Sequence, residues 1–354
     1  MAPARLKILL VGSLPPPLGG CAVTLQLLVE ELRRRDDVEV RVLDTAGIRA
    51  QGLRGALRFA AALRGLVRGA RPVDLVTLHV ATTAVPLGGL LVLAASRLAG
   101  RPFVLRKFGG TDYRRLGPIR GWLAHLVARR ADLYLTETRE HLALALARGI
   151  AGARWFPTAR PDGPAPGARE RSPDEGCCRF VYVGHVCRAK GLRELVEAWE
   201  QVPPEATLDV YGPLFDDLPR GFLDGRPRIA YHGPIPAAEV AGVLARHHVL
   251  VLPTLADTEG YPGSIVEALM AGLPVVATRV GAIPELVDEA VGCLVDPGDA
   301  RQLGAAMARL CQEPELYRSL RQGTRARGSA FSSRRWSEEF VRYCTEAAAA
   351  RGAA

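Results

Sequence analysis

The chain has only three lysines and lacks a long apolar segment of the kind that crosses a membrane. An uncharged window of membrane-spanning length, Leu75–Ser96, contains Pro86, Gly88 and Gly89. These residues favour a strand, a loop and a buried helix over a transmembrane helix. The N-terminal apolar run is too short for a signal peptide. We therefore expect a soluble, cytoplasmic protein without a transmembrane segment.

The chain also lacks the residue patterns that hold metals or build disulfide frameworks. Its seven cysteines are scattered, the adjacent Cys177–Cys178 pair lacks zinc spacing, and the odd count argues against a disulfide framework. The acidic pairs Asp216–Asp217 and Asp257 with Glu259 have no His or Cys partners at ligand spacing. We expect reduced thiols, as in a cytoplasmic protein, and no metal cofactor.

Acidic residues are scarce in the first half of the chain. Residues 1–170 hold 26 Lys and Arg against 13 Asp and Glu, whereas residues 171–354 hold 20 against 24. Arginines recur at nearly helical spacing at positions 54, 58, 64, 68 and 71. This pattern predicts a basic helix that either lies on an anionic lipid surface at the inner face of the membrane or is simply solvated. Nucleic acid is not an expected partner, because no binding motif accompanies the charge.

Short apolar strands alternate with helical segments along the whole chain, a pattern typical of parallel sheets covered on both faces. Strands are predicted at Lys7–Gly12, Val38–Leu43, Asp74–Leu78, Phe103–Arg106, Asp132–Thr136, Phe180–Val183, Thr207–Tyr211, Ile229–Tyr231, Val249–Leu252 and Pro274–Ala277. Residues 159–176 are rich in Pro, Gly and charge, and read as a linker. The pattern predicts an α/β fold of two facing Rossmann-like domains, residues 1–165 and 166–335. Ligands of such sheets bind at the carboxyl ends of the strands, so we expect a site in the cleft between the domains.

Residues 257–276 carry the clearest functional signal. Glu259 lies in a loop, a Gly and Pro run follows, and a short helix holds Glu267 near its start. The free backbone amides around Gly260 and Gly263–Ile265, Ser264 included, would form an anion site at the helix N-terminus. Carboxylates beside a phosphate site can bind hydroxyl groups, so the combination indicates a nucleotide sugar. Two structural alternatives remain open: Ser264 and Glu267 also form a capping-box pattern, and Glu259 alone could be a solvated loop acid.

The segment EGYPGSIVE resembles the paired-glutamate motif of the retaining glycosyltransferases of family 4, which have the two-domain GT-B fold. The similarity continues through GLPVVATRVGAIPE and GCLVDPGD. It implies a retaining enzyme that moves a sugar from a UDP-, GDP- or ADP-sugar to a glycan or lipid-linked acceptor, without a metal. In this family Glu267 would bind the ribose hydroxyls and Glu259 the sugar hydroxyls. Residues 336–354 would form the closing helix that crosses back to the N-domain.

The segment YVGHVCRAKG resembles the family loop in which Arg and Lys hold the donor diphosphate. Lys190 matches that Lys, and Gly184 precedes the loop. His185 stands where the family has Arg, and imidazole offers a weaker contact than a bidentate guanidinium. Arg188, three residues later, is the residue we expect to compensate.

Four further residues of the N-terminal half are candidates that follow from the resemblance. Gly19 and Gly20 would lie near the donor phosphates, although a plain tight turn is the alternative. Many family members contact the sugar with a His that corresponds to Phe108 here, and Phe cannot hydrogen-bond a hydroxyl. Asp112, and after it Lys107, are the nearby polar candidates.

The resemblance therefore implies a glycosyltransferase of a cell-surface polysaccharide or glycoconjugate pathway. A nucleotide-sugar hydrolase or epimerase and a non-catalytic nucleotide-sugar-binding protein are the alternatives, the last supported by Phe108 and His185. A dinucleotide oxidoreductase is not expected, because the first strand-to-helix loop lacks the compact GxGxxG fingerprint.

Overall fold

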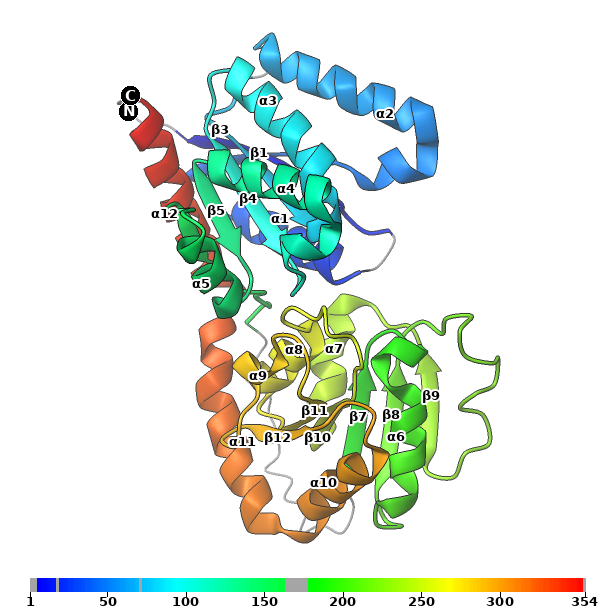
Figure 1. The fold of residues 1–354 in the computed structure, drawn as a ribbon. Coiled ribbons are helices and arrows are strands. Elements are labelled where there is room, and N and C mark those ends of the chain that lie inside the picture. The colour runs from blue at the N-terminus through cyan, green and yellow to red at the C-terminus, as the bar shows by residue number, and fades with distance from the viewer. Residues whose placement is uncertain (1–4, 17–18, 70–71, 163–177, 353–354) are drawn as a thin grey trace. The chain divides into compact units, whose positions relative to one another are not determined.

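The computed structural model describes residues 5–16, 19–69, 72–162 and 178–352, and the chain folds into two compact units (Figure 1). The first unit is Met1–Pro161 with Ser333–Ala354, and the second is Asp162–Ser332. The predicted linker from residue 163 onward, the predicted boundary at residues 165 and 166, and Cys177 lie outside the described residues.

The sheet of the first unit has six parallel strands in the order β2-β1-β3-β4-β5-β6. The strands are β1 (Leu6–Gly12), β2 (Val38–Asp44), β3 (Leu75–Ala81), β4 (Phe103–Phe108), β5 (Leu133–Thr136) and β6 (Ala153–Trp155). Their side chains are mostly apolar and buried, as expected for a sheet covered on both faces. Five of the six were predicted, and β6 was not.

Helices cover both faces of this sheet. They are α1 (Gly20–Arg33), α2 (Ala46–Val67), α3 (Leu90–Leu98), α4 (Pro118–Arg130), α5 (Arg139–Ala147) and α12 (Ser333–Gly352), with the short helices η1 (Thr82–Ala84), η2 (Val85–Gly89) and η3 (Tyr113–Leu116). One apolar core joins the sheet to α1 and α12, and another joins it to α2, α3 and α4. Residues 75–96 thus form a strand and short helical turns, as predicted. The helix after them is only half buried, because α3 exposes Leu90 and Leu91, so the prediction of a buried helix is wrong. Within the described residues, no helix has the length and apolar character needed to span a membrane.

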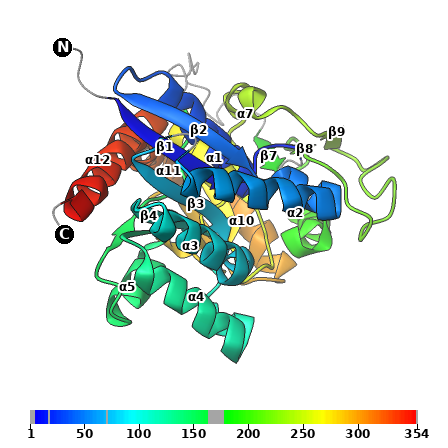
Figure 2. The ribbon, with the colours of Figure 1, turned by 90° about the horizontal axis from the view of Figure 1, so that it is seen from above.

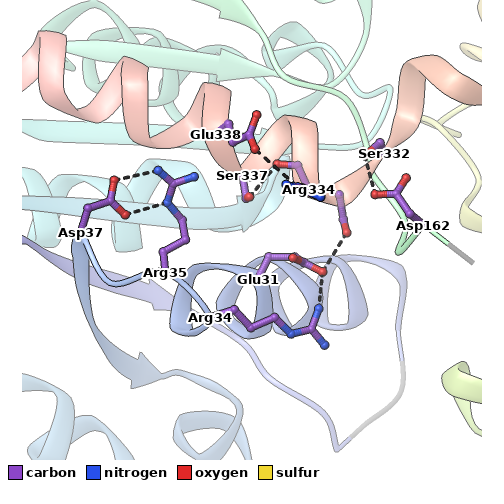
Figure 3. A network of polar contacts seen from close by, with 10 residues as sticks. Glu31, Arg34, Arg35, Asp37, Asp162, Ser332, Arg334, Ser337 and Glu338 are labelled. Carbon is purple, nitrogen blue, oxygen red and sulfur yellow. Dashed lines mark hydrogen bonds and ion pairs between the residues drawn. The ribbon is translucent and has the colours of Figure 1, made fainter.

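The last helix, α12, is part of the first unit's core. Its Trp336, Phe340 and Cys344 are buried against α1 and the sheet. At its start, the Ser333 hydroxyl donates to Glu31 at 3.2 Å, and Glu31 also accepts a hydrogen bond from Arg34 (Figure 3). The C-terminal segment therefore completes the unit that begins the chain.

The second unit repeats the architecture with a parallel sheet in the order β12-β11-β10-β7-β8-β9. Its strands are β7 (Arg179–Val183), β8 (Thr207–Tyr211), β9 (Ile229–Gly233), β10 (Val249–Leu252), β11 (Val275–Thr278) and β12 (Gly292–Val295). Its helices are η5 (Arg188–Lys190), α6 (Leu192–Ala198), η6 (Trp199–Gln201), α7 (Ala237–Leu244), α8 (Gly263–Ala271), α9 (Ile283–Leu286), α10 (Ala300–Gln312), α11 (Pro314–Gly328) and η7 (Ser329–Phe331). The predicted fold class, two units each with a parallel sheet, is confirmed.

We expect Phe340→Ala to lower the free energy of unfolding of the full chain by about 3–5 kcal/mol, because it removes a ring from a closely packed core. Phe340 is 0% exposed and lies near Phe156. Urea unfolding followed by circular dichroism measures the change. The matched control is Glu346→Ala on the exposed side of the same helix, which breaks only a surface ion pair and should cost less than about 1 kcal/mol. Equal losses for the two variants would contradict the buried position of Phe340.

Candidate functional site

Two loops meet at the carboxyl edge of the second sheet, because the strands before them are neighbours. Strands β7 and β10 pair in parallel, so the loops that follow them emerge at the same edge. The first loop carries Lys190 in η5, and the second carries Glu259. The Lys190 ammonium group and the Glu259 carboxylate form an ion pair, with 23% and 15% of their side chains exposed. The structure thus brings together two of the predicted site residues from segments 69 positions apart.

Close backbone packing fixes the distance between these loops. Gly191 has a φ of 74°, and a Cβ atom there would lie 1.8 Å from the Pro253 carbonyl oxygen. The amide of Leu255 donates to the Ala189 carbonyl at 2.9 Å. Glycine at 191 is therefore required both by the left-handed backbone and by the contact with the second loop.

Hydrogen bonds hold both the side chain and the backbone of Glu259. The Thr254 hydroxyl lies 3.1 Å from Glu259 Oε1, and the Glu259 carbonyl accepts the Ala282 amide at 3.1 Å. Gly281 lies so close that a Cβ atom would sit 2.4 Å from the Glu259 carbonyl oxygen. The alternative of a merely solvated loop acid does not describe this side chain. The sequence analysis missed Thr254, although its position two residues after β10 is a recognisable signal for a site residue.

The predicted anion site lies at the N-terminus of α8. Pro262 is the N-cap residue, and no side chain caps the helix, so the alternative of a Ser264–Glu267 capping box is wrong. The amides of Gly263 and Ser264 precede the first hydrogen bond of the helix and point out of its N-terminus. The Ile265 amide, also predicted to bind phosphate, instead donates to the Pro262 carbonyl at 3.1 Å. Glu267 lies half-buried in the second turn of α8.

His185 and Arg188, the other predicted site residues of the β7 loop, contact parts of the protein other than Glu259. The His185 ring packs 4.8 Å from the Phe215 ring, and the His185 carbonyl accepts the Tyr182 hydroxyl at 2.6 Å. Arg188, which was predicted to compensate for His185, donates from Nε to the Asp217 carbonyl at 2.8 Å. Gly184 and Gly260 are half-buried and buried, respectively. Of the predicted cations, Lys190 is the one that the structure pairs with Glu259.

In the first unit, Gly19 and Gly20 mark the beginning of α1. Gly19 is its N-cap residue in extended backbone, and Gly20 is its first residue. A Cβ atom at either position would meet no heavy atom within 4 Å among the residues that the structure describes. Neither backbone conformation nor packing inside the unit requires glycine here. The alternative of a plain tight turn therefore receives no support, and the phosphate role stays a prediction.

Phe108, the residue at the family's His position, is only 3% exposed at the end of β4. The guanidinium of buried Arg106 lies over its ring at 4.5 Å and over the Phe156 ring at 4.3 Å. Desolvation lowers the pKa of Arg106 to about 9, with the charge of Glu137 opposing the shift. Phe108 thus serves an internal stack, which gives a structural reason for this departure from the family pattern.

Asp112 and Lys107, the polar candidates near Phe108, already form hydrogen bonds within the protein. Asp112 caps η3 and forms two hydrogen bonds with Arg148, at 2.7 and 3.0 Å, which lower its pKa to about 2. Lys107 is 1% exposed and donates to the Gly109 carbonyl at 3.2 Å. Burial lowers the pKa of Lys107 to about 7, although the charge of Glu137 opposes the shift.

Glu137 was missed by the sequence analysis. It directly follows β5, is 5% exposed, and accepts hydrogen bonds from the Gly109 amide at 2.9 Å and from the Thr158 hydroxyl. A carboxylate immediately after a buried strand is the signal that could have identified it. His79 is buried, with its Nε2 3.0 Å from the Thr77 hydroxyl and with no hydrogen-bond partner for its Nδ1 among the residues that the structure describes.

No cluster of three or more His, Cys, Asp or Glu side chains suited to a metal ion occurs in the described part of the chain. The β7–β10 edge carries the Lys190 ammonium group, the Glu259 carboxylate, the Thr254 hydroxyl and the first amides of α8. Such a set binds an anion beside hydroxyl groups.

Residues 177–313 match the family described as "Glycosyl transferases group 1". The match contains the Lys190 loop, Glu259 and α8, so the family segment and the geometric site coincide.

Several relatives of known name match part of this chain. The amylovoran biosynthesis glycosyltransferase AmsK of Erwinia amylovora is 33% identical over 146 residues, which are 38% of this chain and 36% of that protein. The 2-deoxystreptamine glucosyltransferase of Streptomyces kanamyceticus is 27% identical over 291 residues, covering 72% of this chain and 73% of that protein. The matches to AmsK, to a sulfoquinovosyl transferase of Arabidopsis thaliana and to TuaC of Bacillus subtilis span 36%, 27% and 32% of those proteins.

Solved structures show that the whole chain has the GT-B fold. HepE of Anabaena, determined with UDP and glucose, has a TM-score of 0.73 at 18% identity and covers 97% of this chain and 100% of its own. Sucrose-phosphate synthase of Thermosynechococcus elongatus has a TM-score of 0.76 at 18% identity, with 98% and 100% covered.

We expect Lys107 to make stability depend on pH. Its folded pKa of about 7 lies below the usual 10.5, so between these values the unfolded chain binds a proton that the folded chain does not. The contribution of Lys107 to the free energy of unfolding therefore rises with pH across this window, by up to about 1.4 kcal/mol per pH unit. Urea unfolding of the wild type and of Lys107→Met from neutral to alkaline pH isolates this contribution.

The stability of the wild type relative to Lys107→Met should increase with pH over that window. Val104→Ala is the control, because it weakens the same strand without removing a titratable group and should shift the curve without changing its shape. Parallel curves for the wild type and Lys107→Met would contradict a lowered pKa at Lys107.

Proposed function

We propose that this chain is a glycosyltransferase that transfers a sugar from a nucleotide diphosphate sugar to a hydroxyl group of an acceptor. The observation that carries the proposal is the Lys190–Glu259 pair beside the N-terminus of α8, inside the segment that matches the group 1 family. Relatives that match part of the chain are named for polysaccharide synthesis, among them AmsK and O-antigen chain mannosyltransferase B of Escherichia coli.

The donor diphosphate would bind to Lys190 and to the amides of Gly263 and Ser264. An ammonium group and a helix N-terminus both favour negative charge, and both are already in place before the reaction. They would stabilise the charge that develops on the diphosphate as it leaves. Thr254 and Glu259 would keep the Lys190 side chain oriented in the absence of donor.

Glu259 and Glu267 would accept hydrogen bonds from the donor's hydroxyl groups, Glu259 from the sugar and Glu267 from the ribose. The acceptor oxygen would form a bond to the anomeric carbon on the side from which the diphosphate departs, so the configuration is retained. The bond between the anomeric carbon and the phosphate oxygen breaks, and its electron pair remains on the diphosphate. The acceptor proton passes to a phosphate oxygen, which leaves no charge on the product sugar.

The donor and acceptor classes follow from chemistry and from the relatives. HepE structures hold UDP and UDP-glucose, which supports testing UDP-sugars first, followed by GDP- and ADP-sugars. A glycan or lipid-linked acceptor fits the polysaccharide pathways named for the relatives, and we propose that the reaction takes place at the cytoplasmic side of the membrane. The net charge of the chain, +9, favours an anionic partner.

We expect Lys190→Ala and Glu259→Gln each to lower the transfer rate about 100- to 1000-fold, the usual result of losing one preorganised charge-stabilising group. A thermal-shift screen against UDP-, GDP- and ADP-sugars identifies the donor, since a ligand at 100 times its Kd stabilises the folded state by about 2.7 kcal/mol. For the wild type and each variant, the release of the nucleotide diphosphate and the formation of the glycosylated product are then measured in the same reaction.

The control is Arg327→Ala, which removes a salt bridge with Asp288 in the same unit but away from the two loops. It should keep the wild-type rate. A wild-type transfer rate for Lys190→Ala would show that Lys190 plays no part in the mechanism. Nucleotide release without a glycosylated product, with any acceptor offered, would instead indicate a hydrolase, and donor binding without turnover would indicate a non-catalytic protein.

We also expect donor binding and transfer to be unchanged by EDTA, because the proposed site neutralises the diphosphate with Lys190 and helix amides. Titration of the donor in the presence of EDTA, and again after adding Mg²⁺ or Mn²⁺, provides the measurement. A loss of donor binding in EDTA that Mg²⁺ or Mn²⁺ restores would overturn the metal-free site.

A further inference from the structure

One layer of the first unit contains basic and apolar residues but no acidic residue. Helices α2, α3 and α4, with the short helices η2 and η3, lack Asp and Glu entirely. Among the described residues, twelve large apolar side chains are exposed, and nine of them lie on these elements. They are Leu53, Leu57, Val67, Leu87, Leu90, Leu91, Leu98, Ile119 and Trp122. We call this the acid-free face.

Helix α2 shows the pattern most clearly. Gly52, with φ 51° and ψ −126°, breaks the helix, and the long segment after it packs on the unit through Leu63 and Leu66. Its outer side carries Leu53 and Leu57, which are 77% and 61% exposed. The exposed arginines of this segment are Arg54, Arg58 and Arg64. None of these arginines takes part in a salt bridge that the structure shows within its described range.

Helix α3 lies between α2 and α4 in Figure 2, and it contacts both. Leu91 and Leu98 on α3 are 55% and 75% exposed, and Ile119 and Trp122 on α4 are 75% and 63% exposed. Arg120 stands between the last two. The exposed apolar side chains therefore extend across three adjacent helices instead of occurring singly, which is unusual for a surface that stays in water.

A pocket of about 390 Å³ opens on the same face between η3 and α4. Arg114, Trp122, His125 and Arg148 are among its lining residues. The Arg114 side chain, beside the exposed indole of Trp122, suits the phosphate of a lipid headgroup, since Trp and Arg are both favoured at the boundary between headgroups and acyl chains. Arg148 is already paired with Asp112.

The opposite face of the unit differs in charge. Its outer helix α12 carries Glu338, Glu339 and Glu346, which pair with arginines of the same helix. Helices α2, α3 and α4 thus expose arginines and leucines without an acid on the same helices, whereas α5, which packs on the same face of the sheet through Ala145, carries Glu140.

We propose that the acid-free face docks the protein on a membrane surface that contains anionic lipids. Stable attachment needs two contributions, and this face supplies both: apolar side chains that enter the headgroup region and arginines that attract the lipid charge. A second copy of the chain is a poorer occupant, because two such faces would place like charges against each other. This inference gives a lipid-linked acceptor a place to meet the enzyme, but vesicle binding can be measured without any transfer reaction.

The test is cosedimentation of the full chain with vesicles of phosphatidylglycerol and phosphatidylcholine in equal parts, compared with phosphatidylcholine alone. We expect binding to the anionic vesicles that weakens with salt. The triple variant Arg54→Ser, Arg58→Ser and Arg64→Ser should bind about 100-fold more weakly, since each arginine near such a surface contributes about a factor of five. The double variant Leu53→Gln and Trp122→Gln should also bind at least about tenfold more weakly, at low and high salt alike.

Two controls match these variants. Arg193→Ser, Arg220→Ser and Arg301→Ser together remove the same charge from exposed positions of the second unit, and Phe215→Gln alters an exposed apolar side chain of that unit. Both should bind like the wild type. Equal binding to both kinds of vesicle, or equal losses in the test and control triple variants, would overturn the proposal. So would concentration-dependent dimers that the Leu53 and Trp122 changes abolish, because the face would then belong to a second copy.

If the transferase assignment fails, vesicle binding and its response to these variants are unaffected. If vesicle binding fails while the Lys190 and Glu259 variants behave as expected, the membrane inference alone is lost.

Discussion

The parallel pairing of β7 with β10 is the constraint on which the candidate site depends. It places two loops at one edge of the sheet, and Gly191 allows their backbones to approach until a side-chain atom would overlap the Pro253 carbonyl. At that distance the Lys190 ammonium group reaches Glu259, and Thr254 and Ala282 hold the acid from its other sides. The paired charges are thus positioned by backbone packing before any ligand arrives, which is what electrostatic preorganisation requires.

The pair also implies a change of partners on binding. Without an anion, Glu259 compensates the charge of Lys190, so neither half-buried charge is left alone. A donor diphosphate would offer Lys190 a second acceptor, and the sugar hydroxyls would offer Glu259 new donors. In the proposed reaction the two residues would therefore change partners together, which would make the site selective for a ligand that carries both an anion and hydroxyl groups.

The sequence predicted most of this fold, because ten of the twelve strands are apolar runs that alternate with helices. Strand β6 is the three residues ARW and offers no apolar run. Strand β12 is the apolar segment GCLV, which the prediction overlooked. The second failure concerns the start of α8, where the capping-box pattern could not reveal that Pro262 ends the preceding loop and takes the N-cap position. Contacts between distant segments, such as Thr254 with Glu259 or Phe108 with Arg106, leave no trace in spacing because tertiary packing creates them.

The strand order explains why a stretch of sequence that is poor in Asp and Glu ends up as one group of adjacent helices. From β1 the chain steps to β2 through α1, and from β2 it returns past β1 to β3, β4 and β5 in the opposite direction. Right-handed crossovers require that connections running in opposite directions lie on opposite faces of the sheet, so α2, α3 and α4 share the face that α1 does not occupy. Residues 45–130 contain only two acids, Asp74 and Asp112, and both lie outside these helices. A stretch of sequence that is poor in acids therefore forms adjacent helices that carry none. The exposed leucines and Trp122 lie among the arginines of these helices, so apolar side chains are in place to insert where the arginines are attracted to anionic lipid.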